Sequence, residues 1–300
     1  MDDTDVSTVE NVGPVYRLLD ALGMRTTKTV WPFGYTEGPS NFRDSDTLED
    51  PAYVEFVRWL ASRGFEIAYH GATMESSPRE RTLRGLDRYR ELFGGVPRVY
   101  ANHAYNQENL YWGVERLDDP FLRALYARTE GRPSGYYDGH RPDSPRYWGD
   151  RSTAIRYVRN LTCADINTLK YNPSMPYHDP RRPAVDRWFS ASDAESVTEF
   201  NALVTPEAQD RLEREGGVCI IATHLGKGYA RDGTVHPTTK ALLERLAAKP
   251  GWFVPVDQLL DFLAAQRGGA STLPASEWRA MQWRWAWDLL ARNIARRVGR

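Results

Sequence analysis

The sequence predicts an α/β protein whose parallel strands close into a barrel. Short apolar runs alternate with stretches of helical periodicity along most of the 300 residues, which is typical of right-handed crossovers between parallel strands. An open, doubly wound sheet fits this alternation too, but no G-x-G-x-x-G or G-x-x-x-x-G-K-[ST] motif follows any predicted strand. We therefore favour the barrel, and the length suits a single barrel domain.

Capping residues and local composition predict the individual helices and strands. Ser7 or Thr8 can cap a first helix that ends near Gly23, and residues 26–33 are β-branched and aromatic, as strands are. The stretch 217–223 (Gly-Val-Cys-Ile-Ile-Ala-Thr) is the clearest buried strand. We expect seven strands, at residues 26–33, 65–69, 96–101, 161–164, 187–190, 217–223 and 252–254. We expect helices at residues 8–22, 53–63, 79–93, 151–159, 193–203, 206–215, 237–248 and 256–266, with mostly helical sequence up to about residue 127.

The chain has no boundary linker and no internal repeat. We expect residues 1–270 to form one catalytic barrel and residues 271–300 to form a Trp/Arg-rich amphipathic helix packed on it. The segment Glu277–Arg300 carries four tryptophans and six arginines. Such a helix can also lie on a membrane surface, so peripheral membrane contact stays open as an alternative.

Composition excludes several classes of protein. Hydrophobic residues make up 41% and charged residues 26%, as in ordinary globular proteins, and the net charge of −1 provides no global field for nucleic acid. No stretch approaches 18 apolar residues and the N-terminus resembles no secretory signal, so we expect a cytoplasmic protein without a membrane span. Cys163 and Cys219 make no zinc-binding pattern and are expected to be free thiols.

Three histidines directly follow predicted strands: His70, His103 and His224. The carboxyl ends of barrel strands meet at one face, where active sites of such folds lie. Asp2 and Asp3 precede the first helix and are either a helix-capping acidic turn or a carboxylate pair. Histidines with a carboxylate suit Zn²⁺ or a similar ion that activates water, while a separate histidine can protonate a leaving group.

In order and spacing, residues 2–266 resemble the polysaccharide deacetylase superfamily, also called NodB-like or carbohydrate esterase family 4. Asp2 and Asp3 look like the opening Asp-Asp pair, and His70 matches the first histidine of the H-x-x-x-H ligand pair. The run that ends in His224 is similar to the strand that delivers the late histidine. The resemblance implies a distorted (β/α)7 barrel, with a first strand that is short or missing because only Met1 precedes the pair.

The resemblance also implies roles for these residues. Asp2 would act as the base, Asp3 and His70 would bind a divalent metal ion, and His224 would act as general acid. The expected reaction removes an acetyl or other acyl group from an N-acetylated sugar or polysaccharide, with metal-bound water attacking the amide carbonyl.

One ligand departs from the family pattern. Met74 stands where the second histidine would be, so we expect His103 to supply this ligand from the next strand, with Glu75 as a less favoured substitute. The expected ion is Zn²⁺, with Co, Ni or Mn as alternatives.

Aromatic and polar residues in the long loops and at strand ends are candidates for sugar recognition. Those that we expect to bind substrate are Trp31, Arg98, Asn102, Tyr105, Trp112 and Asp165. Two other functions stay open at this point. The barrel could bind carbohydrate without catalysis, or it could be a metal-independent glycoside hydrolase, which needs two carboxyl groups about 5 to 9.5 Å apart.

Overall fold

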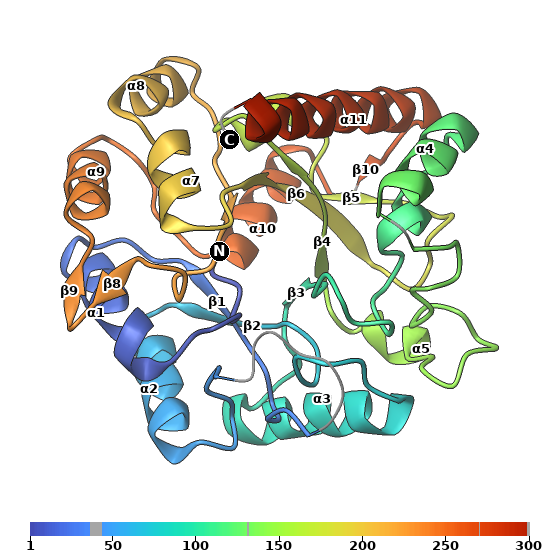
Figure 1. The fold of residues 1–300 in the computed structure, drawn as a ribbon, viewed down its shortest axis with the longest axis horizontal. Coiled ribbons are helices and arrows are strands. Elements are labelled where there is room, and N and C mark those ends of the chain that lie inside the picture. Colours follow the sequence, from blue (N-terminus) through green and yellow to red (C-terminus); the bar gives the residue numbers. More distant parts are fainter. Residues whose placement is uncertain (37–43, 131, 270, 299–300) are drawn as a thin grey trace.

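The computed structural model describes residues 1–36, 44–130, 132–269 and 271–298, and its strands form a curved parallel sheet surrounded by helices (Figure 1). Its main strands pair in the order β1-β2-β3-β4-β6-β7, and each of these pairs is parallel. The six strands are β1 Thr27–Val30, β2 Glu66–Tyr69, β3 Val99–Ala101, β4 Tyr157–Cys163, β6 Arg187–Asp193 and β7 Ile221–Ala222.

The first three residues close this sheet into a ring. Asp2 lies between β1 and the end of β7, forming parallel bridges to Lys28 and Thr223. Its N–H donates to the carbonyl of Thr27 at 2.8 Å, and the N–H of Asp3 donates to the carbonyl of Thr223 at 2.7 Å. Residues 1–3 therefore act as a very short first strand, and the described part of the chain forms a seven-stranded parallel barrel, as predicted.

The predicted strand at residues 252–254 is wrong, because these residues join no strand in the structure. They lie between Pro250 and Pro255, which have no N–H to donate to a ladder. Their contact with the barrel wall is a hydrogen bond from the N–H of Arg25 to the carbonyl of Phe253, at 3.2 Å. The seventh strand of the ring is instead provided by the N-terminus.

The predicted helix at residues 151–159 is also wrong in its extent. Helix α5, Gly149–Ser152, ends early, and β4 starts at Tyr157, four residues before the predicted strand. The aromatic and β-branched pair Tyr157 and Val158 is buried in the sheet, an environment that suits β-structure.

The connections agree with the predicted alternation of strands and helices. Thr8 caps α1 through a reciprocal capping box with Asn11. The other helices are α1 Val9–Ala21, α2 Pro51–Ser62, α3 Arg79–Phe93, α4 Pro120–Glu130, α6 Thr168–Tyr171, α7 Val197–Leu203, α8 Pro206–Arg214, α9 Pro237–Ala247, α10 Val256–Gln266 and α11 Ala275–Val298. Small elements that were not predicted are helix α6 and the strands β5 Tyr177–His178, β8 Ala230–Arg231, β9 Thr234–Val235 and β10 Ser271–Thr272, while the 3₁₀ turn Gly113–Arg116 lies in the stretch predicted to be mostly helical.

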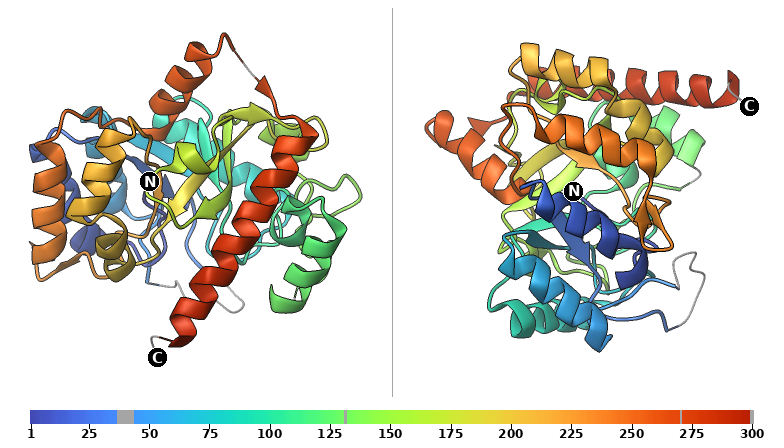
Figure 2. Two further views of the ribbon diagram at one scale, coloured as in Figure 1. Left: turned by 90° about the horizontal axis from the view of Figure 1, so that it is seen from above. Right: turned by 90° about the vertical axis from the view of Figure 1, so that its left-hand side faces the viewer.

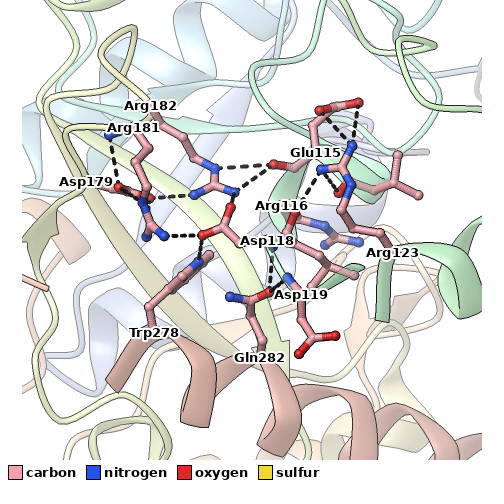
Figure 3. A network of polar contacts seen from close by, with 12 residues as sticks. Glu115, Arg116, Asp118, Asp119, Arg123, Asp179, Arg181, Arg182, Trp278 and Gln282 are labelled. Carbon is pink, nitrogen blue, oxygen red and sulfur yellow. Dashed lines mark hydrogen bonds and ion pairs between the residues drawn. The ribbon is translucent and has the colours of Figure 1, made fainter. Parts of the chain in front are cut away.

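Helix α11 packs on the outside of the barrel beside α4, and its C-terminal end extends past the body of the molecule (Figures 1 and 2). Trp278, Met281 and Trp285 form its buried face. The buried Gln282 carboxamide oxygen accepts from the backbone N–H of Asp118 at 2.7 Å, within a larger network of arginines and carboxylates (Figure 3). No helix in the described residues is long and apolar enough to cross a membrane.

Candidate metal centre

The alternation of side chains along the first strand decides which acidic residues reach the barrel interior. Neighbouring residues of a strand point to opposite faces, so two adjacent aspartates cannot both point inward. Asp3 and Asp5 lie on the inner side, where Asp3 meets Arg159 of β4 and Asp5 meets three histidines. Asp2 lies on the outer side, against Tyr16 of α1.

The centre of the site is the carboxylate of Asp5, which is buried among the three predicted histidines. The Nε2 atoms of His70 and His224 each lie 3.3 Å from an Asp5 oxygen, and that of His103 lies 3.7 Å away. Asp5, His70 and His103 offer ligand atoms within 4.8 Å of one another, a spacing that one metal ion can bridge. The structure therefore brings together the histidines that follow β2, β3 and β7.

The other ring nitrogen of each histidine is held by a fixed oxygen. The Nδ1 atoms of His70 and His224 lie 2.8 and 2.9 Å from the backbone carbonyls of Ala101 and Glu195, respectively. Carbonyl oxygens only accept hydrogen bonds, so each Nδ1 carries a proton and each Nε2 faces Asp5.

Asn106 fixes His103 in the same way. The Asn106 amide nitrogen donates to the carbonyl of Thr73 at 2.9 Å and to Glu108 at 3.0 Å. The amide oxygen must therefore face His103, whose Nδ1 lies 2.9 Å from it. Partners of this kind orient metal-binding histidines in known metal sites.

This arrangement fits a divalent cation. Asp5 Oδ1 and His70 Nε2 are buried, face each other, and meet no hydrogen-bond donor among the described residues. Two buried acceptors that face each other are unfavourable unless a cation or a proton lies between them. Imidazole nitrogens with one carboxylate are the ligands that Zn²⁺ and similar first-row ions prefer.

Electrostatics in the site favour an ionised carboxylate. Burial raises the pKa of Asp5, but His103, His224 and His70 outweigh burial and hold it well below its usual range. Burial lowers the pKa of His70, whereas for His103 and His224 the opposing effect of Asp5 outweighs burial and raises the pKa. Asp5 is thus a permanent negative charge at neutral pH.

Asp3 lies on the same inner face, bound to Arg159 through two hydrogen bonds of 3.0 and 2.5 Å. Burial raises the pKa of the Asp3 carboxyl, but Arg159 outweighs it and lowers the pKa to about 2. Both Asp3 oxygens are occupied by the guanidinium, so the structure gives Asp5, rather than Asp3, the position expected of the metal-binding carboxylate.

Asp2 lies outside the site, contrary to its predicted role as base. Its carboxylate accepts from the Tyr16 hydroxyl at 2.9 Å and the Leu225 N–H at 2.8 Å, and lies 3.0 Å from the ammonium of Lys28. Lys28 is completely buried and also donates to Ser7. Asp2 therefore neutralises a buried lysine between the barrel and α1.

Two predicted substrate residues border the histidines. Trp31 is fully buried, with its ring 5.6 Å from that of His70 and 5.4 Å from that of His103, so it forms a wall of the site. Tyr105 is 49% exposed, and its ring lies 5.5 Å from the His103 ring. Of the six candidates, Tyr105 thus combines exposure with contact to a site histidine.

The other four candidates have structural partners elsewhere. Arg98 lies before β3, at the opposite end of the barrel, and pairs with carboxylates of α10. The buried side chain of Asn102 bonds both backbone groups of Leu110. Trp112 stacks on Arg116 at 4.1 Å, beside α11, and Asp165 pairs with Arg211 of α8.

Met74, which stands at the position of the missing ligand, and Glu75, the less favoured substitute, do not join the candidate cluster. Met74 is buried and contributes no ligand atom. Glu75 pairs with Arg81 at 2.6 Å and accepts from the N–H of Thr36. The expectation that His103, rather than Glu75, joins His70 thus agrees with the geometry.

Sequence reasoning missed Asp5, Arg159 and Asn106. Asp5 had a signal, since it stands two positions after Asp3 and so shares its face of the strand. Arg159 is a charged residue in a largely buried strand, but the sequence places it at the end of a predicted helix, so this signal was not used. Asn106 lies in a loop and had no comparable signal.

The turn after the first strand is strained and closely packed. Val6 has a φ of 51°, in the left-handed region that β-branched residues rarely adopt. A Cβ at Gly226 would lie 2.5 Å from the Val6 carbonyl oxygen, so glycine lets the loop after His224 approach this turn. The turn that carries Asp5 and the loop that carries His224 are thus in close contact.

Comparison with known proteins gives similarity of structure only. No protein-family profile and no curated protein sequence matches the chain. Similar solved structures are described as polysaccharide deacetylases from Mycobacterium smegmatis and Pseudomonas aeruginosa PAO1, and as the Puue allantoinase. They share 14, 15 and 16% identity with this chain and have TM-scores of 0.49, 0.46 and 0.44, respectively. The matches cover 89, 86 and 85% of this chain and 81, 73 and 72% of those chains.

Proposed function

We propose that the protein is a divalent-metal-dependent hydrolase that removes an acyl group from an N-acylated sugar. The observation that carries this proposal is the convergence of three Nδ1-anchored histidines on the buried carboxylate of Asp5, at the end of the barrel where active sites lie. A bound divalent ion would polarise an acyl carbonyl and lower the pKa of water.

Asp5, His70 and His103 would hold this ion, with Zn²⁺ as the best match to their chemistry and Co, Ni or Mn as alternatives. Asn106 and the carbonyl of Ala101 would keep the two rings in the ligating orientation. Asp3 replaces Asp2 as the proposed proton acceptor, because it shares the inner face with Asp5 and Arg159 holds it in place.

His224 would hold a proton at Nε2 for the departing amine. Its side chain is 15% exposed, against 2% for the other two site histidines, so it is the one of the three that a substrate can approach most easily. Tyr105 would offer its exposed ring to the face of a sugar.

Elemental analysis of purified protein tests the metal, using Asp5→Asn, His70→Ala and His103→Ala. The matched control is His178→Ala, because His178 also bonds a backbone carbonyl through Nδ1 but lies outside the cluster. We expect near-stoichiometric metal in the wild type and in the control, and loss of metal in the three site variants. Protein prepared without chelator that contains no metal would contradict the proposal.

Acetate release from N-acetylated sugars tests the reaction in wild type, Asp3→Asn and His224→Ala. We expect both variants to keep metal and to lose activity by about 10² to 10⁴-fold, the usual contribution of a general acid or base. Full metal with no turnover on acylated sugars would favour a carbohydrate-binding barrel without catalysis. Hydrolysis of glycosidic bonds that survives chelators would favour a glycosidase.

A further inference from the structure

An exposed apolar face lies on α4 and α11, away from the histidines. It consists of Phe121 and Leu125 on α4, and Trp283, Trp287 and Leu290 on α11, hereafter the α4–α11 face; Trp283 is partly buried and the other four are exposed. Phe121 and Trp287 are 63% and 64% exposed, and Leu125 and Leu290 are also exposed. Large apolar side chains gathered on the surface of a folded protein usually mark an interaction site.

The face is continuous across the two helices. The spacing of its residues is i, i+4 on α4 and i, i+4, i+7 on α11, so each helix contributes one stripe. The rings of Phe121 and Trp283 stack at 6.0 Å with an interplanar angle of 12°, which joins the stripes. Figures 1 and 2 show the two helices side by side on the outside of the barrel.

The opposite side of α11 is anchored to the barrel. Trp278, Met281 and Trp285 are buried, and Trp278 donates its indole N–H to Asp118 at 2.5 Å (Figure 3). Because these buried residues pack α11 on the barrel, Trp287 and Leu290 on its opposite side point to the solvent and cannot pack on the barrel themselves. The exposed tryptophan is thus presented on a fixed scaffold.

Exposed arginines surround the α4–α11 face. Arg128 follows Leu125 by three positions on α4, and Arg279 and Arg284 lie on α11. None of these three pairs with a carboxylate among the described residues. Guanidinium groups that border exposed tryptophan and leucine match the composition of helices that lie in the interface of a lipid bilayer.

Positive charge is concentrated in the C-terminal segment of the sequence, which includes α11. Residues 275–300 contain six arginines against Glu277 and Asp288, a net charge of +4, while the whole chain carries −1. The remainder of the sequence therefore carries −5, so an anionic surface suits the segment that contains α11 better than the rest of the chain. Two copies of the chain joined through this face would instead bring two like charges together.

We infer that the α4–α11 face docks on an anionic lipid bilayer, with Phe121, Trp287 and Leu290 entering the headgroup region and the arginines contacting lipid phosphates. This inference does not depend on the proposed reaction, because no residue of the face touches the histidine cluster. Docking would place the enzyme at a membrane without a spanning helix.

Co-sedimentation with vesicles tests the inference. We expect the protein to bind vesicles of phosphatidylcholine and phosphatidylglycerol, with little binding to phosphatidylcholine alone and release in high salt. The double variant Trp287→Ser, Leu290→Ser should bind the mixed vesicles at least about tenfold more weakly than the wild type. Each of Arg279→Gln and Arg284→Gln should weaken binding about fivefold.

The matched control is Trp252→Ser, because Trp252 is similarly exposed at 58% but packs edge to face with Phe262, outside the α4–α11 face. It should bind the mixed vesicles as the wild type does. Equal loss in this control, or no binding to the mixed vesicles, would overturn the inference. A dimer in sedimentation analysis that the double variant dissociates, without vesicle binding, would show that a second copy covers the face.

Discussion

Removing the carboxylate of Asp2 should destabilise the protein without removing its metal. The carboxylate accepts two hydrogen bonds and lies 3.0 Å from the ammonium of Lys28, whose side chain is fully buried. In Asp2→Ala the ammonium keeps Ser7 as a hydrogen-bond partner but loses its counter-charge. Breaking one side of a buried ion pair costs about 3 to 5 kcal/mol, and we expect the free energy of unfolding to fall by this amount.

Urea unfolding at pH 7, followed by tryptophan fluorescence, measures this loss. Burial would lower the pKa of Lys28, but Asp2 outweighs burial and raises it. Without Asp2 the pKa falls below that of the unfolded chain, so the variant should recover stability as the pH rises and Lys28 becomes neutral. The double variant Asp2→Leu, Lys28→Met should recover much of the loss, because no unpaired charge remains.

Metal content separates this structural role from the catalytic role that the sequence predicts. Under conditions where both variants are folded, we expect Asp2→Ala to bind metal as the wild type does and Asp5→Asn to be metal-free. Asp20→Ala is the control, since Asp20 forms its ion pairs with Arg25 and Arg63 at the surface and should lose far less stability. Unchanged stability of Asp2→Ala together with loss of metal would refute the reasoning.

Three further predictions concern groups near the site and at the opposite end of the barrel. Burial, followed by the charge of Asp257, raises the pKa of Glu66 to about 8, so stability should fall as the pH rises from about 4.5 to 8. Glu66→Gln should flatten this dependence in urea unfolding at several pH values. Asn106→Leu should weaken metal binding by about 10 to 100-fold in chelator competition, because His103 loses its orienting acceptor. Gly226→Ala should lower the free energy of unfolding by about 1 to 3 kcal/mol in thermal or urea unfolding, since its Cβ meets the carbonyl of Val6.

Each of these predictions has a contrary outcome. An unaltered pH profile in Glu66→Gln would mean that another buried acid sets the dependence. Unchanged metal affinity in Asn106→Leu would mean that His103 is oriented by other contacts. Wild-type stability in Gly226→Ala would mean that the two loops can separate at no cost.

The sequence predicted the alternating barrel and the three histidines because both depend on local patterns. Apolar runs define the strands, and His70, His103 and His224 directly follow three of them. The carboxyl ends of parallel strands converge, so placing these residues together needs no knowledge of the loops.

The carboxylates could not be assigned with the same certainty. The side-chain direction of the first strand depends on its register against β1, which is near in sequence, and against β7, a contact across 220 positions. A shift of one residue reverses the faces, and this separates Asp2 from Asp3 and Asp5. Residues 252–254 were mistaken for a strand for a related reason, since composition alone does not show which segment pairs with the ring.

Closure of the barrel through residues 1–3 has a consequence for the order of folding. The α-amino group of Met1 donates to the carbonyl of Ile221, 220 positions away, so this side of the ring depends on a contact between segments far apart in the sequence. Contacts of such high sequence separation form slowly, because a long loop must close before they are gained. His224 follows β7, so the histidine cluster around Asp5 is complete only when this side of the ring has closed. Acquisition of metal should accordingly report the final step of folding, in which the ring closes.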